Sequence, residues 1–90
     1  MLENADKYRI DVRLDEDAFY FWKFRDPQLD QWHKSGSFED KQECLENIAA
    51  FLMRTFYWRV PIYDENGTLL GKPQDENDIS FLMNPQERGE

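Results

Sequence analysis

The stretch "AFYFWKF", from Ala18 to Phe24, places five aromatic rings in seven residues and decides how the rest of the chain is arranged. Clustered aromatic side chains favour the pleated, half-buried surface of a β-strand. Alternate side chains of a strand point to opposite faces. The stretch therefore predicts a strand with two faces that do different work.

The two faces differ in polarity. One face carries Tyr20, Trp22 and Phe24, which we expect to meet a helix and form core. The opposite face carries Phe19, Phe21, Lys23 and Arg25. Since the two cations mark that second face as the solvent side, Phe19 and Phe21 are left on the outside of the sheet.

The neighbouring segments extend this strand into a sheet. "YRIDVRL", residues 8–14, alternates apolar and charged residues, which predicts a half-buried strand. "DED", residues 15–17, is a turn, so the two strands form an antiparallel hairpin. Pro27 ends the aromatic strand because it lacks an N–H group. "QWHKSG", residues 31–36, follows as a short third strand.

A single long helix is predicted over residues 38–57. Ser37 is the expected N-cap, with Asp40 three residues later at the spacing of a capping box. The apolar residues then recur every three or four positions, as in an amphipathic helix facing the sheet. This stripe consists of Leu45, Ile48, Ala49, Leu52 and Phe56.

The last third of the chain predicts a second hairpin and a docked segment. Residues 60–72 read as two strands joined by a type I′ turn at Asn66-Gly67. "ISFLM", residues 79–83, is a short apolar segment that docks on the core, and residues 85–90 form a frayed tail. The expected fold is one α+β domain spanning residues 1–90, with its core at about residues 7–84. Its antiparallel sheet follows the order β-β-β-α-β-β, with the helix on one face.

Composition favours a protein partner over nucleic acid. The chain has 19 acidic and 11 basic residues, a net charge of -8. Such a surface repels nucleic acid and attracts basic proteins, or serves solubility alone. No run of about 20 apolar residues predicts a membrane span. The N-terminal residues lack a signal-peptide pattern, and the single Cys44 suits a reducing compartment, so we expect a cytoplasmic protein.

Residues for catalysis or metal binding are scarce. His33 is the single histidine and Cys44 the single cysteine, so they cannot assemble the usual zinc site. We expect His33 on the surface of a short strand and Cys44 as a small apolar core residue. The acidic runs at 15–17 and 75–78 lack the spacing of a calcium loop, and no glycine-rich phosphate loop occurs. The sequence predicts a non-enzymatic protein without metal or cofactor.

Two surfaces are candidates for binding. Phe19 and Phe21 are either covered by residues 79–83 or form an apolar patch for a partner. The second surface is acidic and belongs to the helix and the second hairpin; it is either a solvated face or an imitation of nucleic-acid phosphates. Its main members are Glu39, Glu43, Glu46, Asp64 and Glu65, with Asp75, Glu76 and Asp78 beyond them.

The run from Phe19 to Phe51 resembles two families. Its strands, and the helix that opens on Ser37 and Phe38, are similar to small β-β-β-α domains of the YegP-like type. The "SF-x-x-K-x-E" pattern, completed by Lys41 and Glu43, also resembles the arm-binding N-terminal domain of tyrosine integrases. The latter resemblance implies DNA binding by the sheet face away from the helix, with Lys23, Arg25 and Lys34 clustered there free of acids.

By size and charge the chain also resembles small acidic inhibitors from phages and mobile elements, including anti-CRISPR proteins. We therefore expect a protein-binding module that blocks a basic nucleic-acid-binding site by steric occlusion and mimicry. The alternatives are a DNA-binding accessory domain of the integrase-arm type and a self-associating structural protein. The expected state is a monomer or a homodimer.

Overall fold

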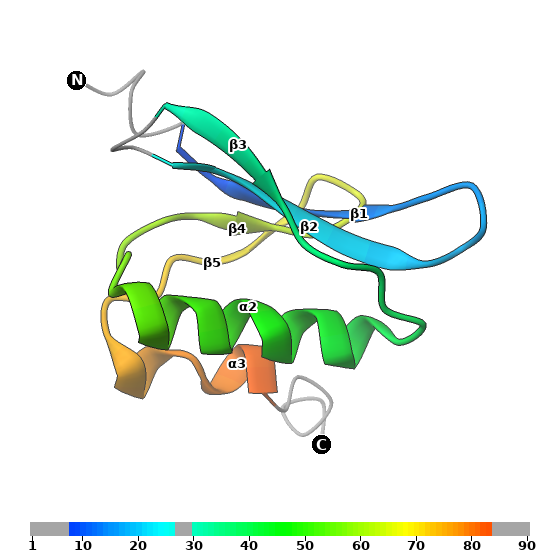
Figure 1. The fold of residues 1–90 in the computed structure, drawn as a ribbon. Coiled ribbons are helices and arrows are strands. Elements are labelled where there is room, and N and C mark those ends of the chain that lie inside the picture. Colours follow the sequence, from blue (N-terminus) through cyan, green and yellow to red (C-terminus); the bar gives the residue numbers. More distant parts are fainter. Residues whose placement is uncertain (1–7, 27–29, 84–90) are drawn as a thin grey trace.

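The computed structural model describes residues 8–26 and 30–83, which form a sheet and a helical layer (Figure 1). The elements in chain order are β1 (Ile10–Leu14), β2 (Tyr20–Asp26), β3 (Gln31–Lys34), α2 (Lys41–Thr55), β4 (Ile62–Tyr63), β5 (Leu69–Gly71), the 3-10 helix η1 (Glu76–Asp78) and α3 (Ser80–Met83). The α+β class is confirmed. The expected tail at residues 85–90 and the limits of the core at 7 and 84 lie outside the described residues.

The sheet is mixed, so the expectation of an antiparallel sheet is wrong at one place. Its strand order is β3-β2-β1-β4-β5. β1 pairs antiparallel with β2, but β4 pairs parallel with β1 through Ile10 and Ile62. The reason is the crossover: α2 carries the chain across the sheet before β4, and β4 then runs in the same direction as β1.

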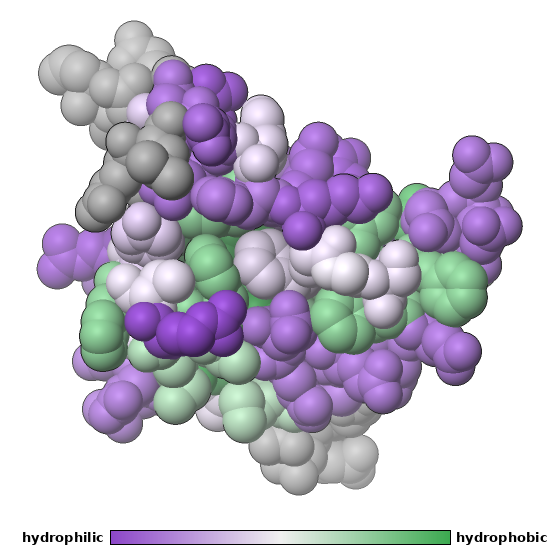
Figure 2. All heavy atoms as spheres, in the orientation of Figure 1, coloured by the Kyte–Doolittle hydropathy of each residue, from purple (hydrophilic) through white to green (hydrophobic). Residues whose placement is uncertain are grey.

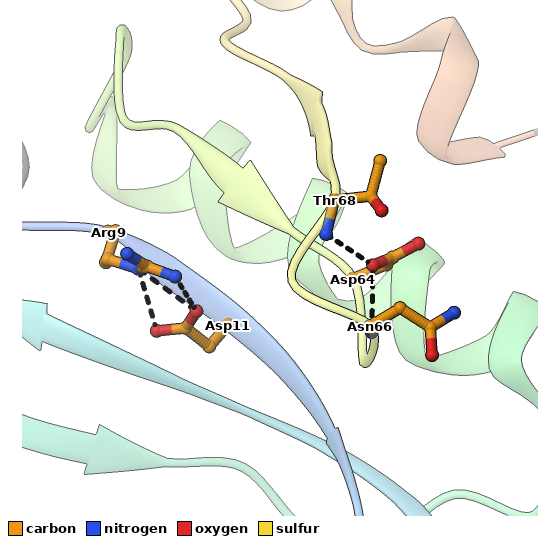
Figure 3. Close-up of polar contacts among 5 residues, drawn as sticks. All are labelled: Arg9, Asp11, Asp64, Asn66 and Thr68. Carbon is orange, nitrogen blue, oxygen red and sulfur yellow. Dashed lines mark hydrogen bonds and ion pairs between the residues drawn. The ribbon is translucent and has the colours of Figure 1, made fainter.

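The β1–β2 and β4–β5 hairpins use the same three-residue loop, preceded by an aspartate. Asp15 Oδ1 accepts from the N–H groups of Asp17 and Phe19, and Asp64 Oδ1 accepts in the same way two and four residues later (Figure 3). The third loop residue has a positive φ in each, 67° at Ala18 and 80° at Gly67. The type I′ prediction is therefore wrong, because that turn needs a positive φ at both central residues. Ala18 thus belongs to the turn, and β2 begins two residues later.

The helix is shorter than predicted at both ends. Asp40, not Ser37, is the N-cap, and its side chain accepts from the Gln42 N–H. The preceding Phe38 instead forms an isolated bridge with Tyr20, with both N–O distances at 2.7 Å, so the chain is still extended there.

At the other end of α2, Phe56 lies outside the apolar stripe. It takes the left-handed conformation at the C-cap, with a φ of 61°, and is 70% exposed. The left-handed residue ends the helix and turns the Phe56 side chain into solvent.

The core lies between the sheet and α2, as the alternation in β2 predicts. Trp22 and Phe24 are buried, and Tyr20 packs against the same cluster. Figure 2 shows the apolar residues gathered in a band between the two layers, with hydrophilic residues above and below. The other buried hydrophobic residues are Ile10, Val12, Cys44, Leu45, Ile48, Ala49, Leu52, Val60, Ile62, Ile79 and Leu82.

The C-terminal segment packs on the helix and not on the outer face of the sheet. In Figure 1, α3 lies alongside α2, on the helical side of the molecule. Ile79 and Leu82 are buried there, and the Gln42 side chain donates to the backbone carbonyls of Leu82 and Met83. Residues 79–83 therefore do not cover Phe19 and Phe21, and that alternative is wrong.

Candidate binding surfaces

The face of the sheet away from α2 concentrates positive charge in this acidic protein. Strand alternation and register place five cations on it, together with three aromatic rings. We call it the basic sheet face. Its cations are Arg9, Arg13, Lys23, Arg25 and Lys34, and its rings are Phe21, Trp32 and Tyr63.

Two of the five cations are neutralised by carboxylates. The guanidinium of Arg9 binds Asp11 with distances of 2.7 and 3.0 Å (Figure 3). It also lies 3.9 Å from the centre of the Tyr63 ring. Arg25 binds Asp30 at 2.8 Å. Asp11 is only 5% exposed, so its carboxylate is shielded from solvent and interacts chiefly with the Arg9 guanidinium. The two pairs leave the face with a net charge of about three positive units.

The remaining cations are Arg13, Lys23 and Lys34. Among the described residues, none of them has a carboxylate within ion-pair distance. Lys23 and Lys34 are direct cross-strand partners, an arrangement that normally weakens a sheet. Each ammonium group lies over a ring, Lys23 at 4.8 Å from Trp32 and Lys34 at 4.6 Å from Phe21. Cation–π contact separates the two charges without neutralising either.

The clustering implied by the integrase resemblance is thus present, but the face is not free of acids. Lys23 stands between Lys34 and Asp11 in register, and Arg25 lies beside Trp32. Asp11 is on the same face but faces Arg9. The carboxylates of Asp11 and Asp30 lower the positive charge of the face but do not make it negative.

The acidic residues expected at a binding site divide into two groups. Glu39, Glu43 and Glu46 are exposed around the first turns of α2. Glu46 also accepts from the Gln42 side chain at 3.0 Å. These three carboxylates point to solvent and form the acidic helix surface.

Asp64 and Glu65 have structural partners instead. Asp64 holds the β4–β5 turn, as described above. Glu65 forms an ion pair with Lys41 at 3.1 Å and keeps only 19% of its side chain exposed. The pair links the β4–β5 turn to the start of α2, with a contribution to stability of about 0 to 1 kcal/mol for a pair this close to solvent.

Phe19 and Phe21 are half-buried and not fully exposed. Phe21 lies under the Lys34 ammonium, and Phe19 lies at the end of the β1–β2 turn, where its carbonyl accepts from the Asp15 N–H. Phe21 thus belongs to the basic sheet face, whereas Asp64 and Glu65 belong to the β4–β5 turn.

A buried carboxylate joins a histidine and a tyrosine at the end of β2. The Tyr57 hydroxyl is 3.3 Å from Asp26 Oδ1, and His33 Nε2 is 3.3 Å from Asp26 Oδ2. Burial, followed by the nearby charge and hydrogen bond of Asp26, raises the pKa of Tyr57. The histidine side chain is 45% exposed, as expected for the surface of a short strand. Asp30, three residues before it in sequence, binds Arg25 instead.

Cys44 is a core residue with an unreactive thiol. It is fully buried, and that burial, with a smaller contribution from Glu65, raises its pKa from 9.0 to about 12. Within residues 8–26 and 30–83 no three potential ligands from His, Cys, Asp and Glu cluster in a way that could hold a metal ion. In the same part of the chain, no helix is both long enough and apolar enough to cross a membrane.

Sequence reasoning missed the basic sheet face as a unit. It identified Lys23, Arg25 and Lys34, but Arg9, Arg13 and Trp32 join them only through strand register. The available signal was the alternation in "YRIDVRL", which already placed Arg9 and Arg13 on the solvent side.

Comparison with known proteins adds no relative to this picture: no family model, curated protein or solved structure matches the chain. The resemblances drawn from the sequence therefore rest on the β-β-β-α pattern and on composition alone. A function has to be inferred from the charge and exposure of the surfaces described above.

Proposed function

We propose that the protein is a non-enzymatic binding domain whose basic sheet face binds the phosphate backbone of a nucleic acid. The observation that supports this best is the cross-strand pair of Lys23 and Lys34, on the same face as Arg13, with no carboxylate within ion-pair distance of any of the three among the described residues. Lys and Arg side chains that have no acidic partner can bind phosphates, and their binding releases the counterions condensed on the nucleic acid.

The net charge of -8 does not prevent this binding at physiological salt. Charges separated by more than about 8 Å of solvent are largely screened at 0.15 M. The shortest dimension of the molecule is 23 Å, and the acidic helix surface lies on the layer opposite the basic sheet face. A bound strand would therefore experience chiefly the charge of the face that it touches.

Fluorescence anisotropy with labelled oligonucleotides over a salt series tests the proposal. Three unneutralised cations predict that log Kobs falls with log[salt] with a slope of about -2 for a single strand and about -3 for duplex DNA. Lys23→Gln should make the slope shallower by about 0.7 to 0.9. Lys72→Gln is the matched control, because Lys72 is an exposed cation outside the basic sheet face. The absence of binding at 50 mM salt, or equal slopes for the two variants, would contradict the proposal.

The second candidate is the inhibitor reading, supported by the exposure of Glu39, Glu43 and Glu46. In it, the acidic helix surface docks on a basic site of a larger, nucleic-acid-processing protein and occludes it. A partner captured from the native host and identified by mass spectrometry should be lost when these three residues are changed to Gln. A partner retained by the triple variant would exclude the acidic helix surface as its binding site.

A further inference from the structure

The outer face of β3 carries an exposed aromatic ring among the cations. Trp32 is 48% exposed, and β3 is an edge strand whose four residues are all exposed. Within residues 8–26 and 30–83, the other large exposed hydrophobic residues are Leu14, Met53, Phe56, Leu69 and Met83, none of which is a tryptophan.

Each of the three rings on the basic sheet face has a cation over it, but Trp32 is the most exposed of the three. Phe21 is half-buried beneath Lys34, and Tyr63 lies beneath the guanidinium of Arg9. At Trp32, Lys23 is 4.8 Å and Arg25 is 5.9 Å from the ring centre. Lys23 thus lies over the indole as well, but the indole is 48% exposed and keeps an accessible surface next to the cations.

From this arrangement we propose that the basic sheet face binds single-stranded nucleic acid, with Trp32 stacking against an unpaired base. This inference rests on the proposed function and names its ligand class. A planar base has an exposed π-face that stacks on an aromatic side chain, while Arg and Lys meet the flanking phosphates. Lys23 lies over the same ring and has no carboxylate within ion-pair distance among the described residues, so its ammonium is placed to meet a phosphate next to that stack.

The shape of the sheet disfavours duplex DNA. Five strands at about 4.8 Å spacing measure about 19 Å across, whereas the major groove of B-DNA is about 12 Å wide. The five-stranded face is therefore too wide to enter the groove as a whole. A single strand has no such barrier, because its bases can turn toward the protein.

The test compares a 12-nucleotide single strand with its duplex, at 100 mM salt, for four proteins. We expect the wild type to bind the single strand at least tenfold more tightly than the duplex. Trp32→Ala should weaken single-strand binding about tenfold or more, from the contribution of one stacked base, and leave duplex binding unchanged. Trp32→Tyr should restore most of the loss, since it returns an aromatic face. Lys23→Gln should weaken both ligands.

The outcomes separate this inference from the proposed function. Equal or tighter duplex binding, or full single-strand affinity in Trp32→Ala, overturns the single-strand assignment but leaves the phosphate-binding face in place if Lys23→Gln still weakens binding. Failure of the wild type to bind either ligand overturns both. Far-UV circular dichroism of each variant checks that it is folded, and DNA and RNA versions of the strand show whether the 2′-hydroxyl contributes.

Discussion

A hydrogen bond between the sheet and α2 provides the sharpest stability test. The indole N–H of Trp22 donates to Asn47 Oδ1 at 2.9 Å. Trp22 is 5% exposed, whereas Asn47 lies on the exposed side of α2. In Asn47→Ala the indole N–H loses this acceptor within the protein.

The magnitude follows from two opposing effects. Leaving a buried donor unsatisfied costs about 1 to 3 kcal/mol. Alanine has a better helix propensity than asparagine, which returns about 0.5 kcal/mol. We therefore expect Asn47→Ala to lower the free energy of unfolding by about 0.5 to 2.5 kcal/mol, from these two terms. For a domain of this size each kcal/mol moves the melting temperature by about 4 to 8 °C.

Urea unfolding followed by circular dichroism measures this change, and a double-mutant cycle with Trp22→Phe isolates the bond. Phenylalanine lacks the donor, so Asn47→Ala should cost little in the Trp22→Phe background. Asn47→Asp is the control because it keeps an acceptor oxygen at the same place. The reasoning is refuted if Asn47→Ala is as stable as the wild type, or if it destabilises both backgrounds equally.

Three further outcomes can be measured on the same instruments. Ala18→Gly should raise the free energy of unfolding by about 0.5 to 1 kcal/mol, because only glycine takes a positive φ without strain. For the same reason, Gly67→Ala should lower the free energy of unfolding. Changes of the opposite sign would contradict the turn geometry that the two hairpins share. Asp40→Ala should lower the free energy of unfolding by about 1 kcal/mol, because the N-cap is lost, whereas Ser37→Ala should change it by less than about 0.5 kcal/mol. A larger effect of Ser37→Ala than of Asp40→Ala would support the predicted capping box instead. Cys44, with its pKa raised to about 12, should react with Ellman's reagent at pH 8 only as fast as the protein opens, so rapid labelling without denaturant would place the thiol at the surface.

The spacing of apolar residues within short stretches was sufficient to predict most helices and strands and the residues of the core. Alternation in "AFYFWKF" assigned Trp22 and Phe24 to the interior, and the helical stripe identified Leu45, Ile48 and Leu52, all of which are buried. These predictions succeed because burial of one face depends on a short repeat that the sequence displays directly.

The errors fall where local chemistry allows two answers. Ser37 and Asp40 are both good N-caps, and only the bridge of Phe38 to Tyr20 shows that the helix begins after the second. Asn66-Gly67 fits both a type I′ turn and the observed loop with its single left-handed residue.

Two further features, the parallel strand pair and the basic sheet face, depend on strand pairing between residues that are distant in sequence. The parallel pairing of β4 with β1 joins residues distant in sequence, so no local pattern indicates it. The basic sheet face has the same origin, since Arg9 and Trp32 become parts of one surface only once β1 and β3 have paired with β2.

The position of β1 at the centre of the sheet has a consequence for folding kinetics. β1, β2 and β3 pair with their neighbours in sequence, but the contact of Ile10 with Ile62 closes a loop of about fifty residues. Local hairpins form faster than such non-local pairings. We therefore expect β4 and β5 to join last and to exchange their amide hydrogens first. The three strands that carry Arg13, Lys23, Arg25 and Lys34 would then remain assembled while the other edge of the sheet opens and closes.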